Sequence, residues 1–199
     1  KSKIKRQMLR EKLKEYNVIL ASKSPRRQQF FRDLDIDFTV QLKEVEEIYP
    51  PELKGTEITD FLADLKSQAY TNLSETDLLI TSDTIVWLDG VALGKPKNAE
   101  DAFKMLKSLS GKKHKVITSI SVKSKVYHKI INDITTVTFK ELSDNEINYY
   151  ITNYKPFDKA GAYGIQEWIG FIAIDKLEGS YFNVVGLPVH KLYKELMNL

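Results

Sequence analysis

The sequence contains no cysteine among its 199 residues. A chain without cysteine has no disulfide framework, no thiol nucleophile and no thiolate ligands for zinc. Its three histidines, His114, His128 and His190, lie too far apart for a histidine-based zinc motif, and the G-x-S-x-G pattern of serine hydrolases is missing. The lack of cysteine fits a reducing cytoplasm but does not establish one.

Long apolar runs are missing too, and so is a strong excess of one charge. No stretch approaches the roughly 20 apolar residues of a membrane span, and no signal peptide is recognised ahead of the first predicted strand, so we expect no membrane partner. The net charge of +3, from 30 basic and 27 acidic side chains, is too small to indicate a nucleic-acid partner, and we do not expect one.

The charge that is unevenly placed lies at the start of the chain, where lysine and arginine crowd residues 1–17. We interpret this segment as a basic N-terminal extension or a solvated leading helix; an arm that binds RNA is the alternative. Residues 18–199 show no repeat, no low-complexity linker and no break in composition. They are long enough to bury one core, and we expect a single domain built as two lobes that share a sheet.

Strand and helix patterns alternate along this domain. Apolar runs and two-residue alternation predict strands at 18–21, 36–42, 78–88, 115–123, 127–139 and 168–174. Amphipathic spacing and capping residues predict helices at 25–34, 56–73 with Thr56 as N-cap, 99–109, 144–150 and from about 188 onward. Asp89-Gly90, directly after a long apolar run, is a hairpin signal that argues against a purely parallel sheet. We therefore predict an α/β fold with a mixed, twisted sheet and flanking helices.

The most informative stretch is a short apolar strand that ends in small residues and leads into Ser24, Pro25, Arg26 and Arg27. Ser24 suits a helix N-cap and Pro25 the first helical position. The two arginines then lie in the first turn, where the helix dipole disfavours a cation. A bound phosphate would reverse this effect, because free N–H groups and two guanidinium groups suit an anion. The alternative is that both arginines point into water.

Asp83 interrupts the apolar run at 78–88, where burial is expected. A buried carboxylate needs a cation, a metal ion or several donors, because an uncompensated buried charge is costly. We interpret Asp83 as a metal ligand or general base; a structural aspartate satisfied by backbone N–H groups is the alternative. Glu44, Glu46 and Glu47 form an acidic cluster on the loop at 43–55. Such a cluster is usually solvated, but one of its carboxylates could join Asp83 in holding Mg²⁺ or Mn²⁺.

Three further positions carry suitable polar groups. Lys66 lies beside the apolar face of its predicted helix, where a surface lysine is the commoner interpretation. Lys95, in a Gly-Lys-Pro turn, can act on a phosphate only as a point charge, since the Walker A pattern is missing. In the stretch at 158–166, small residues allow close backbone approach, and Gln166 offers a donor and an acceptor to a base edge. A plain turn is the alternative there.

Together these stretches resemble the Maf family of nucleoside triphosphate pyrophosphatases, also called septum-formation inhibitor proteins. Seven matching stretches occur in the family's order and cover the chain from about Val18 to its end. They are Ile19–Arg27, Leu62–Lys66, Ser82–Val86, Gly94–Pro96, Leu109–Gly111, Asp158–Gln166 and Gly179–Pro188.

The resemblance implies a cytoplasmic homodimer with an inosine-triphosphatase-like fold and a cleft between two lobes. It implies cleavage of a nucleoside triphosphate between the α- and β-phosphates, giving the monophosphate and pyrophosphate with the help of Mg²⁺ or Mn²⁺. The phosphates would be held by Ser24, Arg26, Arg27, Lys66 and Lys95.

The resemblance also implies the remaining roles. Asp83 would bind the metal or activate the attacking water, Glu47 rather than Glu46 would assist the metal, and Gln166 would help to read the base. The intact Ser-Pro-Arg-Arg and Asp-Lys-Ala-Gly-Ala-Tyr-Gly-Ile-Gln patterns resemble the branch that acts on dTTP and UTP. Lys23 and Glu167 depart from the family's usual small residue and glycine, and the charge of Glu167 leaves the exact substrate open.

Two other classes of function remain. A non-catalytic, nucleotide-binding regulator of cell division would use the same basic turn but would not need Asp83 with an acidic partner. An RNA-binding module would use the basic N-terminus, and its affinity would depend steeply on salt.

Overall fold

The computed structural model describes the backbone of residues 2–199 and the side chains of residues 8–199. The elements are α1 (Ser2–Leu13), β1 (Asn17–Leu20), α2 (Pro25–Asp33), β2 (Phe38–Val40), α3 (Thr56–Gln68), β3 (Asp77–Leu88), β4 (Val91–Leu93), α4 (Ala99–Leu109), β5 (Lys113–Lys123), β6 (His128–Phe139), α5 (Asp144–Tyr154), η1 (Ala160–Ala162), α6 (Trp168–Ala173), β7 (Ile174–Glu178), α7 (Tyr181–Val185) and α8 (Val189–Met197). The strands are hydrogen-bonded in the order β2-β1-β3-β5-β6-β7, and β4 pairs with β3. The predicted mixed α/β fold is confirmed.

The chain divides into two compact units, and the boundary runs through three strands. Unit 1 comprises residues 1–83, 118–132 and 186–199, and unit 2 comprises residues 84–117 and 133–185. Each of β3, β5 and β6 therefore begins in one unit and ends in the other. The two units are described separately below.

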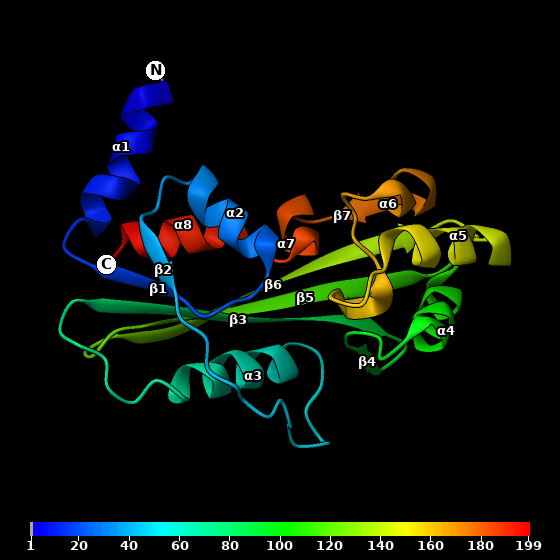
Figure 1. Cartoon of the computed structure of the whole chain (residues 1–199), viewed down its shortest axis with the longest axis horizontal. Helices are drawn as coiled ribbons and strands as arrows, with labels where there is room; N and C mark the ends of the chain where they lie inside the picture. The colour runs from blue at the N-terminus through cyan, green and yellow to red at the C-terminus, as the bar shows by residue number, and fades with distance from the viewer. Residues whose placement is uncertain (1) are drawn as a thin grey trace. The chain divides into compact units, whose positions relative to one another are not determined.

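Unit 1 is built on parallel pairing of β1 with β2 and with the first half of β3. Alternate residues of a strand face opposite sides of a sheet. Val18 and Leu20 accordingly join the core that α2 and α8 cover, whereas Ile19 packs with Tyr70 and Leu79 on the other face. Figure 1 shows α2 and α8 on one side of these strands and α3 on the other.

The sequence suggested a solvated leading helix, but one face of α1 is buried in the structure. Leu9 and Leu13 are almost fully buried in the main core of unit 1, beside Leu192 and Leu196 of α8. The spacing of four residues places both leucines on one face of the helix. Burial of this apolar stripe anchors α1 to the unit, while basic residues such as Arg10 remain exposed.

Unit 2 contains two antiparallel pairs. The second half of β3 pairs with β4 across the Asp89-Gly90 turn, and β6 pairs with β7. The hairpin that Asp89-Gly90 predicted is therefore present, with Gly90 at a φ of +82°. A buried aromatic group of His114, Phe139 and Tyr163 packs edge to face within this unit.

Four predicted elements differ from the structure, one of them the helix predicted at 144–150, which extends to Tyr154. The apolar run at 168–174 is not a strand but the helix α6, followed by β7 from Ile174. Ile169 and Ala173, four residues apart, are buried, whereas Phe171 is 83% exposed, which is helical spacing. The predicted helix at 56–73 ends at Gln68, and its N-cap is Gly55 rather than Thr56. The predicted strand at 36–42 is shorter, with only Phe38–Val40 in β2.

No helix among residues 2–199 is both long and apolar enough to cross a lipid bilayer.

Candidate functional site

The turn between β1 and α2 has the geometry that its sequence predicts. Ser24 is the N-cap of α2, its hydroxyl accepts a hydrogen bond from the backbone N–H of Arg27 at 3.4 Å, and Pro25 is in the first turn. The hydroxyl of Ser22 accepts from the backbone N–H of Ser24 at 3.2 Å. The first turn of α2 carries no acidic residue, so Arg26 and Arg27 bring two cations to a helix end that favours anions.

Arg27 links this turn to another segment of unit 1 and lies near two carboxylates. Its Nε donates to the backbone carbonyl of Gly186 at 2.9 Å, which ties the β1–α2 turn to the segment before α8. Burial lowers the pKa of Arg27 to about 10; the negative charge of Asp83 opposes the shift, the positive charge of Arg26 adds to it, and Glu47 opposes it. The guanidinium therefore stays charged at neutral pH, within the electrostatic range of both carboxylates.

Asp83, Lys66 and Glu47 form one cluster in unit 1. Lys66 Nζ lies 2.7 Å from Asp83 Oδ1 and 3.0 Å from Glu47 Oε1. Asp83 is 6% exposed, as the surrounding apolar run predicted. Burial raises the pKa of Asp83; Lys66 opposes this shift by its charge and hydrogen bond, Glu47 adds to it, and Arg27 opposes it. The charges of Lys66, Asp83, Glu47 and Arg27 therefore act on one another within unit 1.

One carboxylate oxygen of Asp83 has no hydrogen-bond partner among the described residues. Asp83 Oδ2 and Ser82 Oγ are both buried, and neither has a hydrogen-bond partner among the described residues. Buried polar atoms are normally satisfied, so the unpartnered oxygen of a buried carboxylate in a charged cluster is a candidate contact for a ligand or ion. Residues 8–199 contain no group of three or more histidine, aspartate or glutamate side chains that could hold a metal by themselves. Glu47 and Asp83 are thus a two-carboxylate set, which suits Mg²⁺ completed by water and phosphate oxygens.

A polar seam fixes the helix that carries Lys66. Ser119 Oγ of β5 donates to Asp60 on α3 and lies 2.7 Å from Thr59 Oγ1, and Asn132 Nδ2 of β6 donates to both carboxylate oxygens of Asp60 at 3.1 Å. One turn along the helix, Asp64 Oδ1 lies 3.3 Å from His128 Nε2. These polar contacts were not predicted from the sequence, although serines and threonines interrupting the apolar strand at 115–123 were a signal for them.

Lys95 and Gln166 belong to unit 2, and both are exposed there. The turn that carries Lys95 is hydrogen-bonded to the small-residue stretch, since the backbone N–H of Gly161 donates to the carbonyl of Gly94 at 3.0 Å. Gly161 has a φ of +69°, and a Cβ there would lie 2.6 Å from a methyl carbon of Val86. Glycine is therefore required at this position for both conformation and space.

The charge of Glu167, which the sequence left as a concern, is compensated inside unit 2. Its Oε1 lies 3.0 Å from Lys159 Nζ and accepts from the hydroxyl of Tyr150 at 3.3 Å. The same hydroxyl accepts from the backbone N–H of Gly164 at 3.0 Å. Glu167 therefore acts as an internal partner of the stretch that it follows.

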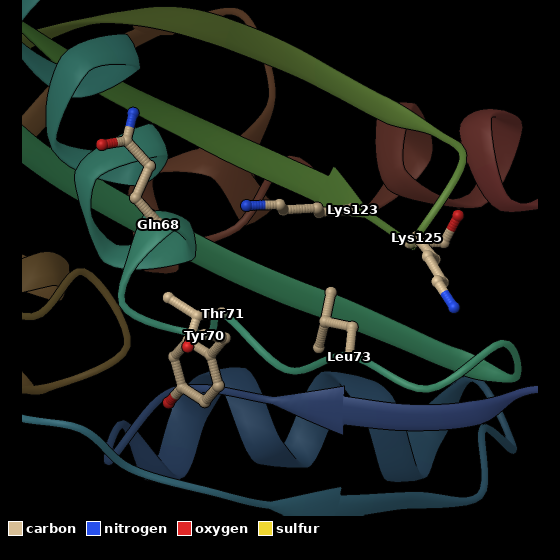
Figure 2. Close-up of a pocket in the computed structure, with 7 residues that line it drawn as sticks. Gln68, Tyr70, Thr71, Leu73, Lys123 and Lys125 are labelled. Atoms are coloured by element: carbon tan, nitrogen blue, oxygen red, sulfur yellow. The ribbon is translucent and has the colours of Figure 1, made fainter.

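A separate hollow of about 350 Å³ lies between the end of α3 and the end of β5 (Figure 2). Lys123 extends toward α3, where its Nζ lies 3.5 Å from the carbonyl of Ser67, and Lys125 is paired with Glu75. Gln68, Tyr70, Thr71, Leu73 and Ser124 complete the lining. No carboxylate is among the residues that line the hollow, so it lacks the paired carboxylates of the Lys66 cluster.

The sequence-predicted residues are thus placed as follows. The Ser24 turn with Arg26 and Arg27, and the cluster of Lys66, Asp83 and Glu47, lie in unit 1; Lys95 and Gln166 lie in unit 2. Electrostatic coupling of Arg27 to Arg26, Asp83 and Glu47 joins the first two groups. The catalytic, substrate-binding and metal-binding roles of these residues stay predictions.

Comparison with known proteins identifies relatives over almost the whole chain. The chain is 63% identical over 193 residues to a Flavobacterium johnsoniae protein named dTTP/UTP pyrophosphatase, covering 96% of this chain and 100% of that protein. It is 59% identical to a protein of the same name from Flavobacterium psychrophilum, covering 96% and 98%, and 45% identical to one from Porphyromonas gingivalis, covering 94% and 96%.

The fold also has solved counterparts. A HAM1 protein from Coxiella burnetii superimposes with a TM-score of 0.51 at 16% identity, covering 92% of this chain and 100% of that one. At this identity the likeness concerns the fold alone, and it agrees with the α/β architecture described above. The family described as Maf-like protein matches residues 17–199. With this match and the sequence relatives together, the chain belongs to the Maf-like protein family.

Proposed function

We propose that this protein is a nucleoside triphosphate pyrophosphatase that hydrolyses dTTP and UTP to the monophosphate and pyrophosphate with the help of Mg²⁺ or Mn²⁺. The observation that carries the proposal is the cluster in unit 1, where a buried carboxylate with one open oxygen lies within the field of Arg27. The names of relatives up to 63% identical over nearly their full length support it.

The basic residues act on the polyphosphate. A triphosphate carries about four negative charges, which repel an attacking water until cations neutralise them. Arg26 and Arg27, with the N-cap Ser24, offer planar donors and a helix N-terminus to the phosphates. Lys66 and Lys95 add point charges. Their shared effect is to stabilise the charge that develops on the leaving pyrophosphate.

Asp83 acts on the water. A divalent ion bound at this site supplies a Lewis acid that polarises the phosphate and the water. Glu47 and Asp83 would hold that ion with one carboxylate each. Asp83 Oδ2 has no hydrogen-bond partner among the described residues, and burial raises the pKa of Asp83, which makes it a stronger base. Asp83 would thereby orient the attacking water and accept its proton.

Gln166 would read the base. Its amide offers both a donor and an acceptor, which a pyrimidine edge requires, and it is exposed in unit 2. Pairing of Glu167 with Lys159 removes a repulsive charge beside it. The proposal therefore keeps dTTP and UTP as substrates despite the departure at Glu167.

The proposal includes a cytoplasmic homodimer. Absence of cysteine suits a reducing compartment. Large apolar side chains of unit 2 are exposed, including Phe171, Tyr181 and Phe182, and exposed apolar groups of this kind favour a protein interface. The alternatives are less well supported: an RNA-binding arm does not explain why α1 is anchored by Leu9 and Leu13, and a regulator does not need the open oxygen of Asp83.

Pyrophosphate release from dTTP, UTP, CTP and a methylated GTP tests the proposal directly. Turnover of dTTP and UTP with equal amounts of monophosphate and pyrophosphate is expected, with a requirement for Mg²⁺ or Mn²⁺. Release of inorganic phosphate instead would indicate cleavage at the γ-phosphate and contradict the proposed bond. Tight nucleotide binding without turnover would favour the regulator.

A further inference from the structure

Three oxygens of the protein lie around the ammonium group of Lys66. Its Nζ lies 2.7 Å from Asp83 Oδ1, 3.0 Å from Glu47 Oε1 and 3.4 Å from the backbone carbonyl of Ser82. An ammonium group has three donors and no acceptor. Two hydrogen bonds, to Asp83 and Ser82, and the ion pair with Glu47 therefore occupy this nitrogen before any phosphate arrives.

This arrangement conflicts with two of the proposed roles at once. Lys66 is expected to hold a phosphate, yet it binds two carboxylates. Glu47 and Asp83 are expected to hold a divalent ion, yet each directs one oxygen at the same ammonium. The conflict disappears if the two states follow one another, because a lysine and a metal ion can neutralise the same pair of carboxylates in turn.

We propose that Lys66 is an internal counter-cation that neutralises Glu47 and Asp83 until a divalent ion binds, and then moves from the carboxylates to the polyphosphate. The inference rests on the proposed function. It makes nucleotide and metal binding cooperative, because the phosphates receive a lysine only when the carboxylates no longer need it. Free metal ions compete with Lys66 and bind weakly without nucleotide.

The surroundings of Lys66 suit such an exchange. Its long, flexible stem can redirect the ammonium without moving α3, which the Ser119–Asp60 contacts hold in place. Glu47 is on a loop without regular structure, and its side chain is 51% exposed, so it can follow an incoming ion. Asp83 remains in the field of Arg27, which limits the cost of losing Lys66. Asp83 Oδ2 has no hydrogen-bond partner among the described residues, so an ion that binds it displaces none there.

Binding of Mn²⁺ in the absence of nucleotide tests the exchange, with free Mn²⁺ measured by electron paramagnetic resonance. Lys66→Met removes the competing cation, so we expect Mn²⁺ to bind about tenfold more tightly than to the wild type. Lys23→Met is the matched control: it removes one exposed positive charge from the neighbouring turn and should change the affinity by less than about threefold. An equal gain in both variants would indicate general charge and overturn the inference. So would unchanged or weaker binding by the Lys66 variant.

Lys66→Arg covers the case in which the methionine variant does not fold. A guanidinium keeps the charge and holds two carboxylates with a fork of donors, so it competes more strongly than the ammonium. We expect Mn²⁺ binding several-fold weaker than in the wild type. A purely structural lysine predicts no such change on this substitution, and an unchanged affinity overturns the exchange.

Nucleotide coupling separates the inference from the proposed function. The α,β-methylene analogue of dTTP should raise the Mn²⁺ affinity of the wild type, and this coupling should be at least severalfold smaller in the Lys66→Met variant, where no lysine is released. Equal coupling in both proteins would contradict the exchange even if the wild type turns over dTTP. Failure to hydrolyse dTTP would reject the proposed function but leave the Mn²⁺ measurements interpretable.

Discussion

Each unit contains a lysine that bridges two carboxylates, and the two clusters have opposite character. Lys66 in unit 1 bridges Glu47 and Asp83 at 3.0 and 2.7 Å. Lys159 in unit 2 bridges Asp158 and Glu167 at 2.8 and 3.0 Å. The lysine side chains are similarly sheltered, at 18% and 14% exposure. Ion-pair geometry alone therefore does not distinguish a reactive site from a structural one.

The difference lies in what surrounds the carboxylates. Asp83 is buried and has one oxygen without a partner among the described residues. Glu167 instead also accepts from Tyr150, and the exposed Asp158 can be solvated. The first cluster keeps a buried lone pair for a ligand, whereas the second is already satisfied. The buried oxygen without a partner is therefore the feature that separates the two clusters.

The largest expected effect is the loss of pyrophosphate release when Asp83 of the unit 1 cluster is changed. Asp83→Asn keeps the shape of the side chain but removes its charge and basicity, so pyrophosphate release should fall by about 10²–10⁴-fold. Lys66 retains Glu47 and the carbonyl of Ser82, so the variant should fold, as thermal unfolding can check. Asp158→Asn, the counterpart in unit 2, should have a far smaller effect. Wild-type turnover by a folded, metal-binding Asp83→Asn variant would exclude the general-base role.

Close packing in unit 2 predicts the next effect. Gly161→Ala places a Cβ 2.6 Å from a methyl carbon of Val86 in a backbone with a φ of +69°. Overpacking and left-handed strain together should lower the free energy of unfolding by about 2–4 kcal/mol, measured in urea.

Gly90→Ala is the matched control for this variant. Gly90 has a φ of +82° but nothing within 4 Å of the added Cβ, so it reports strain alone, about 1–2 kcal/mol. Adding Val86→Ala to Gly161→Ala should recover part of the loss by making room. If Gly161→Ala lowers the free energy of unfolding no more than Gly90→Ala does, the Val86 side chain moves aside at little energetic cost.

The buried histidine of unit 2 gives a pH dependence. Burial lowers the pKa of His114 to about 4, below the usual 6.5. Between these values the unfolded chain binds a proton that the folded protein rejects. The contribution of neutral His114 to the free energy of unfolding is complete above pH 6.5. It is lost as the pH falls toward 4, by up to about 3 kcal/mol.

Urea unfolding at pH 7 and at pH 4.5 measures this loss. His114→Gln should remove most of the dependence, because glutamine does not titrate. His190→Gln changes an exposed histidine and should retain it. If the two variants lose stability equally on acidification, the dependence does not come from His114.

The smallest expected effect concerns the second lysine. Lys159→Met leaves Glu167 without its cation in a sheltered position, so the free energy of unfolding should fall by about 1–2 kcal/mol. Lys176→Met breaks an exposed pair with Glu178 and should cost less than about 1 kcal/mol. Comparable small losses in both variants would mean that the Lys159 cluster is as dispensable as a surface pair.

Much of the site was predictable because its signals are local. The N-cap and first turn of α2 follow from Ser24 and Pro25, and the burial of Asp83 follows from the apolar residues on either side. The apolar run at 168–174 was ambiguous, since a short apolar run fits a strand or a buried helix equally well. Only the structure shows why glycine stands at 170, because a Cβ there would lie 1.8 Å from the carbonyl oxygen of Ile165.

The sequence by itself determined the element types over most of the chain, the basic turn, the buried carboxylate and the absence of thiol chemistry. These properties depend on residues close together in the chain. Only the tertiary structure decided that Lys66 lies between Glu47 and Asp83, that Glu167 is neutralised by Lys159, and that α1 is anchored through Leu9 and Leu13. Partners far apart in sequence meet only when packing brings their elements together, and periodicity carries no information about which charges will meet.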